Sequence, residues 1–149
     1  MARKEWSVYL SGEIHSDWRR EIQAGVEQAD LPVRLSGPVE DHEASDQCGV
    51  RILGEEADPY WRDRKGAGVN SIRTQTLLQA ADVVVVRFGP KYRQWNAAFD
   101  AGYAAALGKP VITLHDEDLN HALKEVDAAA RATARTPGQV VEILEYIIP

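Results

Sequence analysis

The sequence predicts an α/β domain built on a parallel β-sheet. Short strand-like runs alternate with helix-like runs along the 149 residues, and this alternation is typical of parallel sheets covered by helices. One run, DVVVVRF at residues 82–88, is apolar almost throughout, as expected of a central strand buried on both faces. The chain is long enough for the core of one domain and short for two, so we expect a single domain over residues 1–149.

The first elements follow from short-range patterns. Residues 6–10 and 33–36 indicate two strands, and residues 17–29 between them indicate a helix. One apolar stripe at helical spacing supports that helix, formed by Trp18, Ile22, Val26 and Ala29.

The next segment, residues 37–68, has no clear period, and we expect it to form a long loop that is either functional or only partly ordered. A helix is then expected from residue 70, with Asn70 or Ser71 as its N-cap. It leads directly into the central strand of residues 82–88.

The C-terminal part continues the alternation. Residues 96–107 indicate a helix that ends at Gly108, and residues 111–115 indicate a fourth strand. A helix over residues 119–132 and a short strand over residues 132–135 should follow.

The last helix is expected to begin at Thr136, which would cap it, with Pro137 at its first position. Its inward face is predicted to consist of Val140, Val141, Leu144 and Ile147.

Composition excludes several classes of function. The net charge is -6 and no basic run offsets it, which argues against a nucleic-acid partner. No run approaches the roughly 20 apolar residues of a membrane span, and no secretory signal is visible at the N-terminus. The single cysteine, Cys48, excludes an internal disulfide and fits a reducing compartment, so we expect a cytoplasmic protein without a membrane partner.

One carboxylate stands out in the small, apolar stretch RQWNAAFDAGYAAALGKPVITL. Asp100 lies about one turn into the helix that follows the central strand, at the sheet edge where open α/β sheets bind ligands. Asn96, Asp100 and Tyr103 share one face of that helix. The alternative is a solvated Asp that interacts with the helix dipole.

The pattern VYLSG, ADVVVVRF and WNAAFDAGYAAALGKPVI resembles the nucleoside 2-deoxyribosyltransferases and the related nucleotide N-hydrolases. DHEASDQCG, GAGVNSIRTQT and QWNAAFDAGYAAALGKP are similar, almost verbatim, to stretches of the bacterial YtoQ family. The resemblance implies a flavodoxin-like (Rossmann-like) three-layer αβα domain with a five-stranded parallel sheet in the order 2-1-3-4-5.

The resemblance also implies roles for individual residues. Asp100 takes the place of the Glu that attacks the anomeric carbon in the transferases, and a carboxylate can stabilise an oxocarbenium-like transition state and then bond to it. Tyr9 matches the Tyr near that carboxylate. Ser11 and Gly12 match the loop that approaches sugar or phosphate, and Asp82 matches the Asp at the start of the central strand.

Two departures concern the proton that the leaving base needs. Thr74 stands where the relatives carry an Asp that helps to protonate the base, and Gln94 stands near a position where the transferases have a base-contacting Asp. Another group must therefore supply the proton in a reaction of this kind. The candidates are His42, because an imidazole can act as an acid near neutral pH, or another carboxyl of the segment after the second strand, which contains Glu40, Asp41, Glu43 and Asp46. The alternative for His42 is a loop histidine bonded to a neighbouring carboxylate.

Further binding candidates lie at the same sheet edge. Asn70 and Arg73 open the helix predicted from residue 70 and could hold phosphate or carboxylate, although a surface salt bridge is the alternative for Arg73. Trp95 could stack on a base or pack the start of its helix. The full set of binding candidates is Ser11, Gly12, Glu13, Asp46, Asn70, Arg73, Trp95 and Asn96.

Metal and cofactor motifs are weak. His42, Asp46 and Cys48 lie close in sequence, but no pair has a tight metal-ligand spacing. RKGAGVN lacks the Gly-Lys-Ser/Thr ending of a phosphate loop. We therefore expect no metal and no cofactor.

Three functions remain open at this point. The first is cleavage or transfer at the N-glycosidic bond of a nucleoside or nucleotide; the second is a non-catalytic nucleotide-binding or sensing module. The third is hydrolysis of another glycosylated or ADP-ribosyl-type metabolite, with the segment of residues 37–68 selecting the substrate. The resemblance also implies a homodimer or higher homo-oligomer, for which Pro59-Tyr60-Trp61 is a candidate contact.

Overall fold

A computed structural model describes residues 2–149. Its five strands form one parallel sheet in the order β2-β1-β3-β4-β5, which confirms the predicted fold class and strand order. The strands are β1 (Trp6–Gly12), β2 (Val33–Ser36), β3 (Val83–Arg87), β4 (Val111–Leu114) and β5 (Ala132–Ala134).

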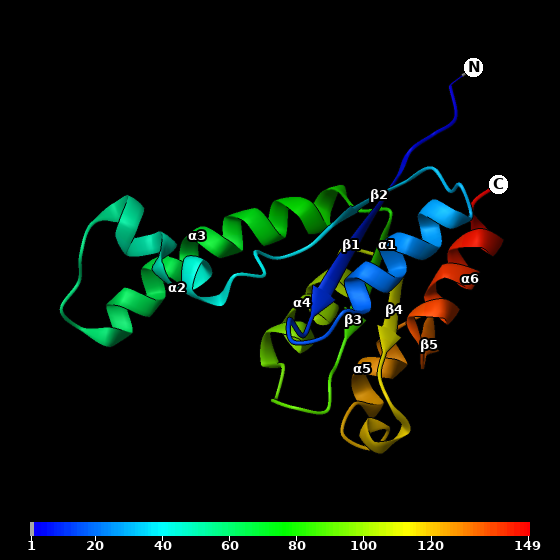
Figure 1. The fold of residues 1–149 in the computed structure, drawn as a ribbon. Helices are drawn as coiled ribbons and strands as arrows, with labels where there is room; N and C mark the ends of the chain where they lie inside the picture. The colour runs from blue at the N-terminus through cyan, green and yellow to red at the C-terminus, as the bar shows by residue number, and fades with distance from the viewer. Residues whose placement is uncertain (1) are drawn as a thin grey trace.

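Helices cover both faces of the sheet (Figure 1). On one face α1 (Trp18–Gln28) and α6 (Pro137–Ile147) pack over an apolar core that includes Val8 and Leu10 of β1. The opposite face is covered by α3 (Pro59–Ala80), α4 (Trp95–Ala106) and α5 (Lys124–Ala129). Because side chains alternate along a strand, Tyr9 and Ser11 leave β1 on the side opposite to Val8 and Leu10.

The prediction of a loop over residues 37–68 is wrong for most of that segment. It forms α2 (His42–Leu53) and the first part of a long α3, which begins at Pro59 rather than at residue 70. Figure 1 shows this helix pair projecting away from the sheet; we call α2 and residues 59–69 of α3 the arm. The two helix starts are capped by the carboxylates of Asp41 and Asp58.

The predicted N-caps Asn70 and Ser71 lie inside α3 instead. Asn70 Nδ2 donates to the Ser45 carbonyl at 3.0 Å, and so links α3 to α2. Ser71 Oγ donates to the Gly68 carbonyl at 2.8 Å within the same helix.

Two glycines bring the arm helices together. A Cβ added at Gly49 would lie 2.2 Å from the Gly66 backbone nitrogen, so α2 can reach α3 this closely only without a side chain there. Gly49 and Gly66 are both buried. The two arm helices therefore pack against each other at two glycines and not through an apolar stripe that faces the sheet.

Two C-terminal details differ from the predictions. The helix expected over residues 119–132 is shorter: a 3₁₀ turn at Glu117–Leu119 precedes α5. The side chain predicted to face inward at Ile147 is partly exposed, and Ile148 is buried in its place, because the chain leaves the helix after Ile147.

Polar contacts fix the elements around β4. His115, fully buried, places Nε2 2.8 Å from Asp127 Oδ2 of α5, and Thr113 Oγ1 donates to Asp127 Oδ1 at 2.8 Å. At the start of β4, Lys109 Nζ donates to the Gln79 carbonyl near the end of α3, at 2.7 Å. These contacts hold α3 and α5 in place on the same side of the sheet.

Within residues 2–149, none of the helices is both long and apolar enough to cross a membrane.

The close approach of the arm helices yields a stability prediction. We expect Gly49→Val to destabilise the protein by about 1–3 kcal/mol, because the added atoms overpack against the α3 backbone. Gly68→Ala is the matched control. Gly68 lies in α3, and a Cβ added there would have no atom within 4 Å. Replacing this helical glycine should stabilise the protein by about 0.5–1 kcal/mol. Chemical unfolding of both variants measures this, and equal stability of wild type and Gly49→Val would contradict the packing.

Candidate active site

A cavity of about 730 Å³ lies outside the carboxyl end of β1, between α3, α4 and the arm. The fold thus places it at the edge where parallel α/β sheets bind ligands. Its volume is in the range of small-molecule sites. The lining side chains that matter for chemistry are Tyr9, Asp46, Asp63, Asn70, Arg73, Thr74, Gln75, Asn96, Phe99, Asp100 and Tyr103.

Asp100 is the central carboxylate of this cavity. It lies in the α4 wall, and Ser11 Oγ of β1 donates to its Oδ2 at 2.7 Å. Burial raises the pKa of Asp100, and the hydrogen bond from Ser11 opposes that rise. A raised pKa makes this carboxylate more basic than a solvated Asp, and the bond to Ser11 fixes the direction of its oxygens.

Tyr9 brings a free hydroxyl to the same cavity. Its side chain is fully buried, and within residues 2–149 no group meets hydrogen-bond geometry with its hydroxyl, although Thr74 approaches closely enough to affect it. Burial raises the pKa of Tyr9; Thr74 lowers it and the Asp100 charge adds to the rise. The phenol therefore keeps its proton and can donate it in a hydrogen bond to a ligand or to Asp100.

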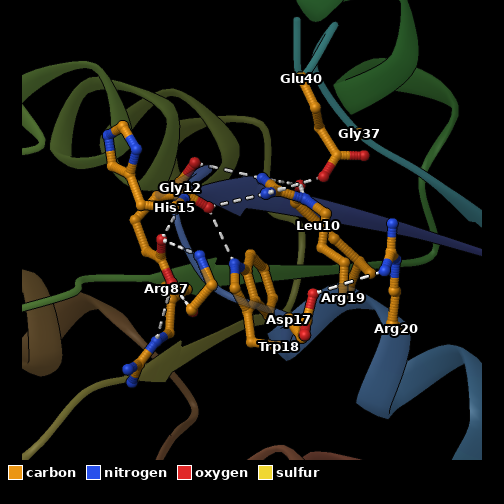
Figure 2. A network of polar contacts seen from close by, with 12 residues as sticks. Leu10, Gly12, His15, Asp17, Trp18, Arg19, Arg20, Gly37, Glu40 and Arg87 are labelled. Atoms are coloured by element: carbon orange, nitrogen blue, oxygen red, sulfur yellow. Dashed lines mark hydrogen bonds and ion pairs between the residues drawn. The ribbon is translucent and has the colours of Figure 1, made fainter.

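The loop after β1 is held by Arg19 of α1 (Figure 2). The buried guanidinium donates to the carbonyls of Leu10, Gly12 and Glu13 at 2.7–3.2 Å. Gly12 has φ +119°, and a Cβ there would lie 2.0 Å from the Arg87 carbonyl oxygen. Only glycine fits this position.

Glu13, a predicted binding residue, is engaged by its own loop. Its carboxylate accepts from the backbone nitrogens of His15 and Ser16 at 2.6 and 3.1 Å and from the Ser16 hydroxyl. Burial opposes ionisation, but these bonds and the Arg87 charge lower the pKa of Glu13. Ser11, Gly12 and Glu13 all lie outside the cavity lining, and Ser11 is linked to the site by its hydrogen bond to Asp100.

The arm and α3 supply the wall facing Asp100. Arg73 Nη1 donates to the Gly37 carbonyl at 2.6 Å, and Asn70 and Asp46 line the cavity with it. His42, the predicted acid, is largely exposed on α2 and pairs with Asp46, with Nε2 3.2 Å from Oδ2. His42 thus reaches the cavity only through Asp46.

Of the two predicted binding residues at the start of α4, one lines the cavity and the other does not. Asn96 lines the cavity, whereas Trp95 is 73% exposed and lies outside the lining. Phe99 and Tyr103 line it as well, although neither was among the binding residues expected from the sequence. Their spacing from Asn96, three and seven residues along the helix, was a signal that could have found both.

In the described part of the chain, no group of three or more His, Cys, Asp and Glu side chains is arranged to hold a metal ion.

Fold and cavity together define an α/β protein with a carboxylate-bearing ligand site at the edge of its sheet. The chain belongs to the family described as nucleoside 2-deoxyribosyltransferase YtoQ, whose model matches residues 9–148. It is 43% identical, over 143 residues, to the Bacillus subtilis protein named uncharacterized protein YtoQ, covering 96% of this chain and 97% of that one. These matches confirm the resemblance inferred from the motifs.

Solved structures show the same fold at low sequence identity. A conserved protein from Enterococcus faecalis V583 aligns with a TM-score of 0.64 and 14% identity, covering 96% of this chain and 99% of the other. A 2-deoxyribosyltransferase from Bacillus psychrosaccharolyticus aligns with a TM-score of 0.54 and 18% identity, covering 91% and 90%. At these identities the likeness shows the fold alone.

The buried Asp100 carboxylate predicts how stability depends on pH. Because its pKa is raised in the folded protein, ionisation favours the unfolded chain, and the loss of stability sets in as pH rises above the ordinary value of 3.8. Asp100→Asn, which keeps an oxygen for Ser11, should be more stable than wild type at neutral pH. The difference should shrink in acid, as measured by urea unfolding over a pH series.

Asp82 is the matched control of opposite sign. The Ser7 backbone nitrogen donates to its carboxylate at 2.9 Å and lowers the pKa of Asp82, helped by Lys4. Asp82→Asn should therefore be less stable than wild type at neutral pH, with the gap closing as pH falls through the range below 3.8. If Asp100→Asn behaves like Asp82→Asn, the burial argument for Asp100 fails.

Proposed function

We propose that the protein cleaves or transfers at the N-glycosidic bond of a nucleoside or nucleotide, with Asp100 as the nucleophile. The observation that carries the proposal is the Asp100 carboxylate, oriented by Ser11 at 2.7 Å in the wall of a cavity of about 730 Å³. The family to which the chain belongs is named for this class of reaction. Fixing a carboxylate before the substrate arrives is what nucleophilic catalysis at a sugar carbon requires.

The reaction has two steps. An electron pair of an Asp100 oxygen forms a bond to the anomeric carbon, the carbon–nitrogen bond breaks, and its electron pair leaves with the base, which takes up a proton. In the second step water or another base attacks the same carbon, loses a proton and releases Asp100. Tyr9, protonated and close to both Thr74 and Asp100, would orient Asp100 or donate to the sugar.

The remaining wall would hold the rest of the substrate. Arg73 uses one nitrogen on the Gly37 carbonyl, and its other donors, with Asn70 and Asn96, would bind ribose hydroxyls or a phosphate. Ser11 acts through Asp100, and Gly12 through the turn that places Ser11.

The proton for the leaving base would come from the His42–Asp46 pair. Thr74 lines the cavity beside Tyr9, but an aliphatic hydroxyl is too weak an acid for this task. Asp46 lines the same cavity and contacts His42 Nε2 at 3.2 Å, and an imidazole can carry a proton near neutral pH.

A second candidate function is a non-catalytic nucleotide-binding or sensing module. The observation that favours it is Thr74, which places a neutral hydroxyl on α3 where an acid would assist departure of the base. Such a module would use the same cavity and would retain its ligand unchanged.

The reaction is tested by mass spectrometry after incubation with nucleosides, nucleoside monophosphates and NAD-like compounds. We expect free base with the wild type and at least a 1000-fold slower release with Asp100→Ala, because removing a covalent nucleophile typically costs roughly that much or more. A second base added to the mixture separates transfer from hydrolysis. Asp82→Asn, which alters a carboxylate outside the cavity lining, is the control.

Full turnover by Asp100→Ala would refute the assignment of the nucleophile. A compound retained by the protein without any product, and held equally by Asp100→Asn, would support the binding module instead.

We further propose that the protein forms a homodimer or higher homo-oligomer through the arm. Its outer end exposes large apolar side chains at the end of α2 and the start of α3, and exposed apolar clusters of this kind mark contact surfaces. They are Ile52, Leu53, Tyr60 and Trp61, each more than half exposed. A second copy of the chain would bury them.

Light scattering after size exclusion tests the oligomer. Trp61→Glu places a charge in that apolar cluster and should shift the mass toward the 16.5 kDa of one chain, because burying an unpaired charge in an interface is unfavourable. Tyr146→Glu alters an aromatic residue that is 92% exposed on α6 and should leave the mass unchanged. A wild-type mass of one chain would overturn the proposal.

A further inference from the structure

Two aromatic rings of α4 line the cavity next to Asp100. Phe99 directly precedes Asp100 and Tyr103 follows one turn later; their ring centroids are 6.4 Å apart and their planes differ by 19°. Phe99 is 65% exposed, so the apolar core does not account for its aromatic ring. A hydrophobic ring left open on the wall of a cavity is available to a ligand.

Contacts with α3 and with the sheet hold the part of α4 that carries the two rings. Gln79 Nε2 of α3 donates to the Tyr103 hydroxyl at 3.0 Å, which fixes the second ring. The opposite side of α4 is buried against the sheet through small residues, Ala97, Ala101 and Ala104. The Tyr103 ring is therefore positioned before a ligand binds, with the Phe99 ring stacked beside it, and preorganised side chains lose little entropy on binding.

The groups around the rings indicate what kind of ring would bind. Hydroxyl and amide side chains, which can donate and accept hydrogen bonds, line much of the cavity: Ser45, Asn70, Ser71, Thr74, Gln75 and Asn96. Arg73 is the one cationic residue among the lining side chains of the described chain. Three carboxylates, those of Asp46, Asp63 and Asp100, line the cavity as well. A flat aromatic face with hydrogen-bonding groups around it matches a planar heterocycle with a hydrogen-bonding edge.

We propose that Phe99 and Tyr103 form a stacking platform for a planar heterocyclic ring, with Phe99 as its open face. This inference deepens the proposed function, on which it rests for the identity of the ring: the base of the nucleoside would lie on Phe99 while its sugar carbon faces Asp100. The platform also assigns base binding to Phe99 rather than to Trp95, which lies one turn earlier and outside the cavity lining.

Binding of free bases tests the platform without any reaction. Adenine, hypoxanthine, cytosine and thymine are titrated calorimetrically into the full-length protein, with 2-deoxyribose as a probe that lacks a planar ring. Phe99→Ala should weaken binding of the bases about 5- to 150-fold, the range that stacking on one aromatic side chain contributes. Phe99→Tyr should retain most of the affinity, because it keeps the ring.

The control is Tyr146→Ala, an exposed aromatic residue on α6 outside the cavity lining, which should bind like the wild type. Circular dichroism of Phe99→Ala should match the wild type, since Phe99 is exposed. Wild-type affinity in Phe99→Ala, a loss confined to Trp95→Ala, or no binding of any base by the wild type would each overturn the platform.

Failure of the platform and failure of the reaction have different signatures. If nucleosides release base and Phe99→Ala leaves KM unchanged, the platform is wrong and the reaction stands. If bases bind in a Phe99-dependent way but no nucleoside is cleaved, the platform stands and the nucleophilic role of Asp100 is wrong.

Discussion

The site depends on one buried cation, the Arg19 guanidinium at the carboxyl end of β1. A charge removed from water must be paired or hydrogen-bonded, and Arg19 satisfies this requirement with the carbonyls of Leu10, Gly12 and Glu13. The Trp18 ring packs 4.5 Å from the guanidinium carbon and donates its own nitrogen to the Glu13 carbonyl at 2.8 Å. With its carbonyls held in this way, the strand end has little freedom, and Ser11 between them keeps its direction toward Asp100.

The candidate site lies on one face of the sheet. On the side of α1 and α6, β1 contributes Val8 and Leu10 to an apolar core. On the other side the same strand presents Tyr9, whose hydroxyl lacks a hydrogen-bond partner in the described chain, and Ser11, which is used by Asp100. The raised pKa of Asp100 costs stability at neutral pH, and functional sites are where proteins retain such costs.

The sequence predicts the sheet well because its central strands are locally unambiguous. β3 is a run of four buried valines, which only a strand covered on both faces explains in a short segment between turns. The arm was not predicted as helical because no apolar stripe marks α2 or the start of α3. The two helices pack on each other through Gly49 and Gly66. The caps at Asp41 and Asp58-Pro59 were the available signals.

The site was predictable to the extent that strand ends reveal it. Asp100 follows β3, and Tyr9 and Ser11 lie in the second half of β1. The parallel topology alone brings such residues together. Phe99 lies three residues after Asn96, a spacing that places both on one helix face, but it was not among the residues selected from the sequence. The contact of Gln79 with Tyr103 joins two helices, and such a contact is invisible in sequence.

The arm supplies part of the polar lining of this cavity. Tyr9, Ser11 and Asp100 belong to the sheet and its flanking helix, whereas Asp46 and Asp63 come from the arm. The arm, between β2 and β3, therefore contributes to the polarity of the wall that faces the carboxylate. Since Asn70 ties α3 to the Ser45 carbonyl of α2, a change in arm packing would move that wall and leave Ser11 and Asp100 in place. In the proposed reaction, the arm would therefore contact the substrate while β1 and α4 hold Asp100.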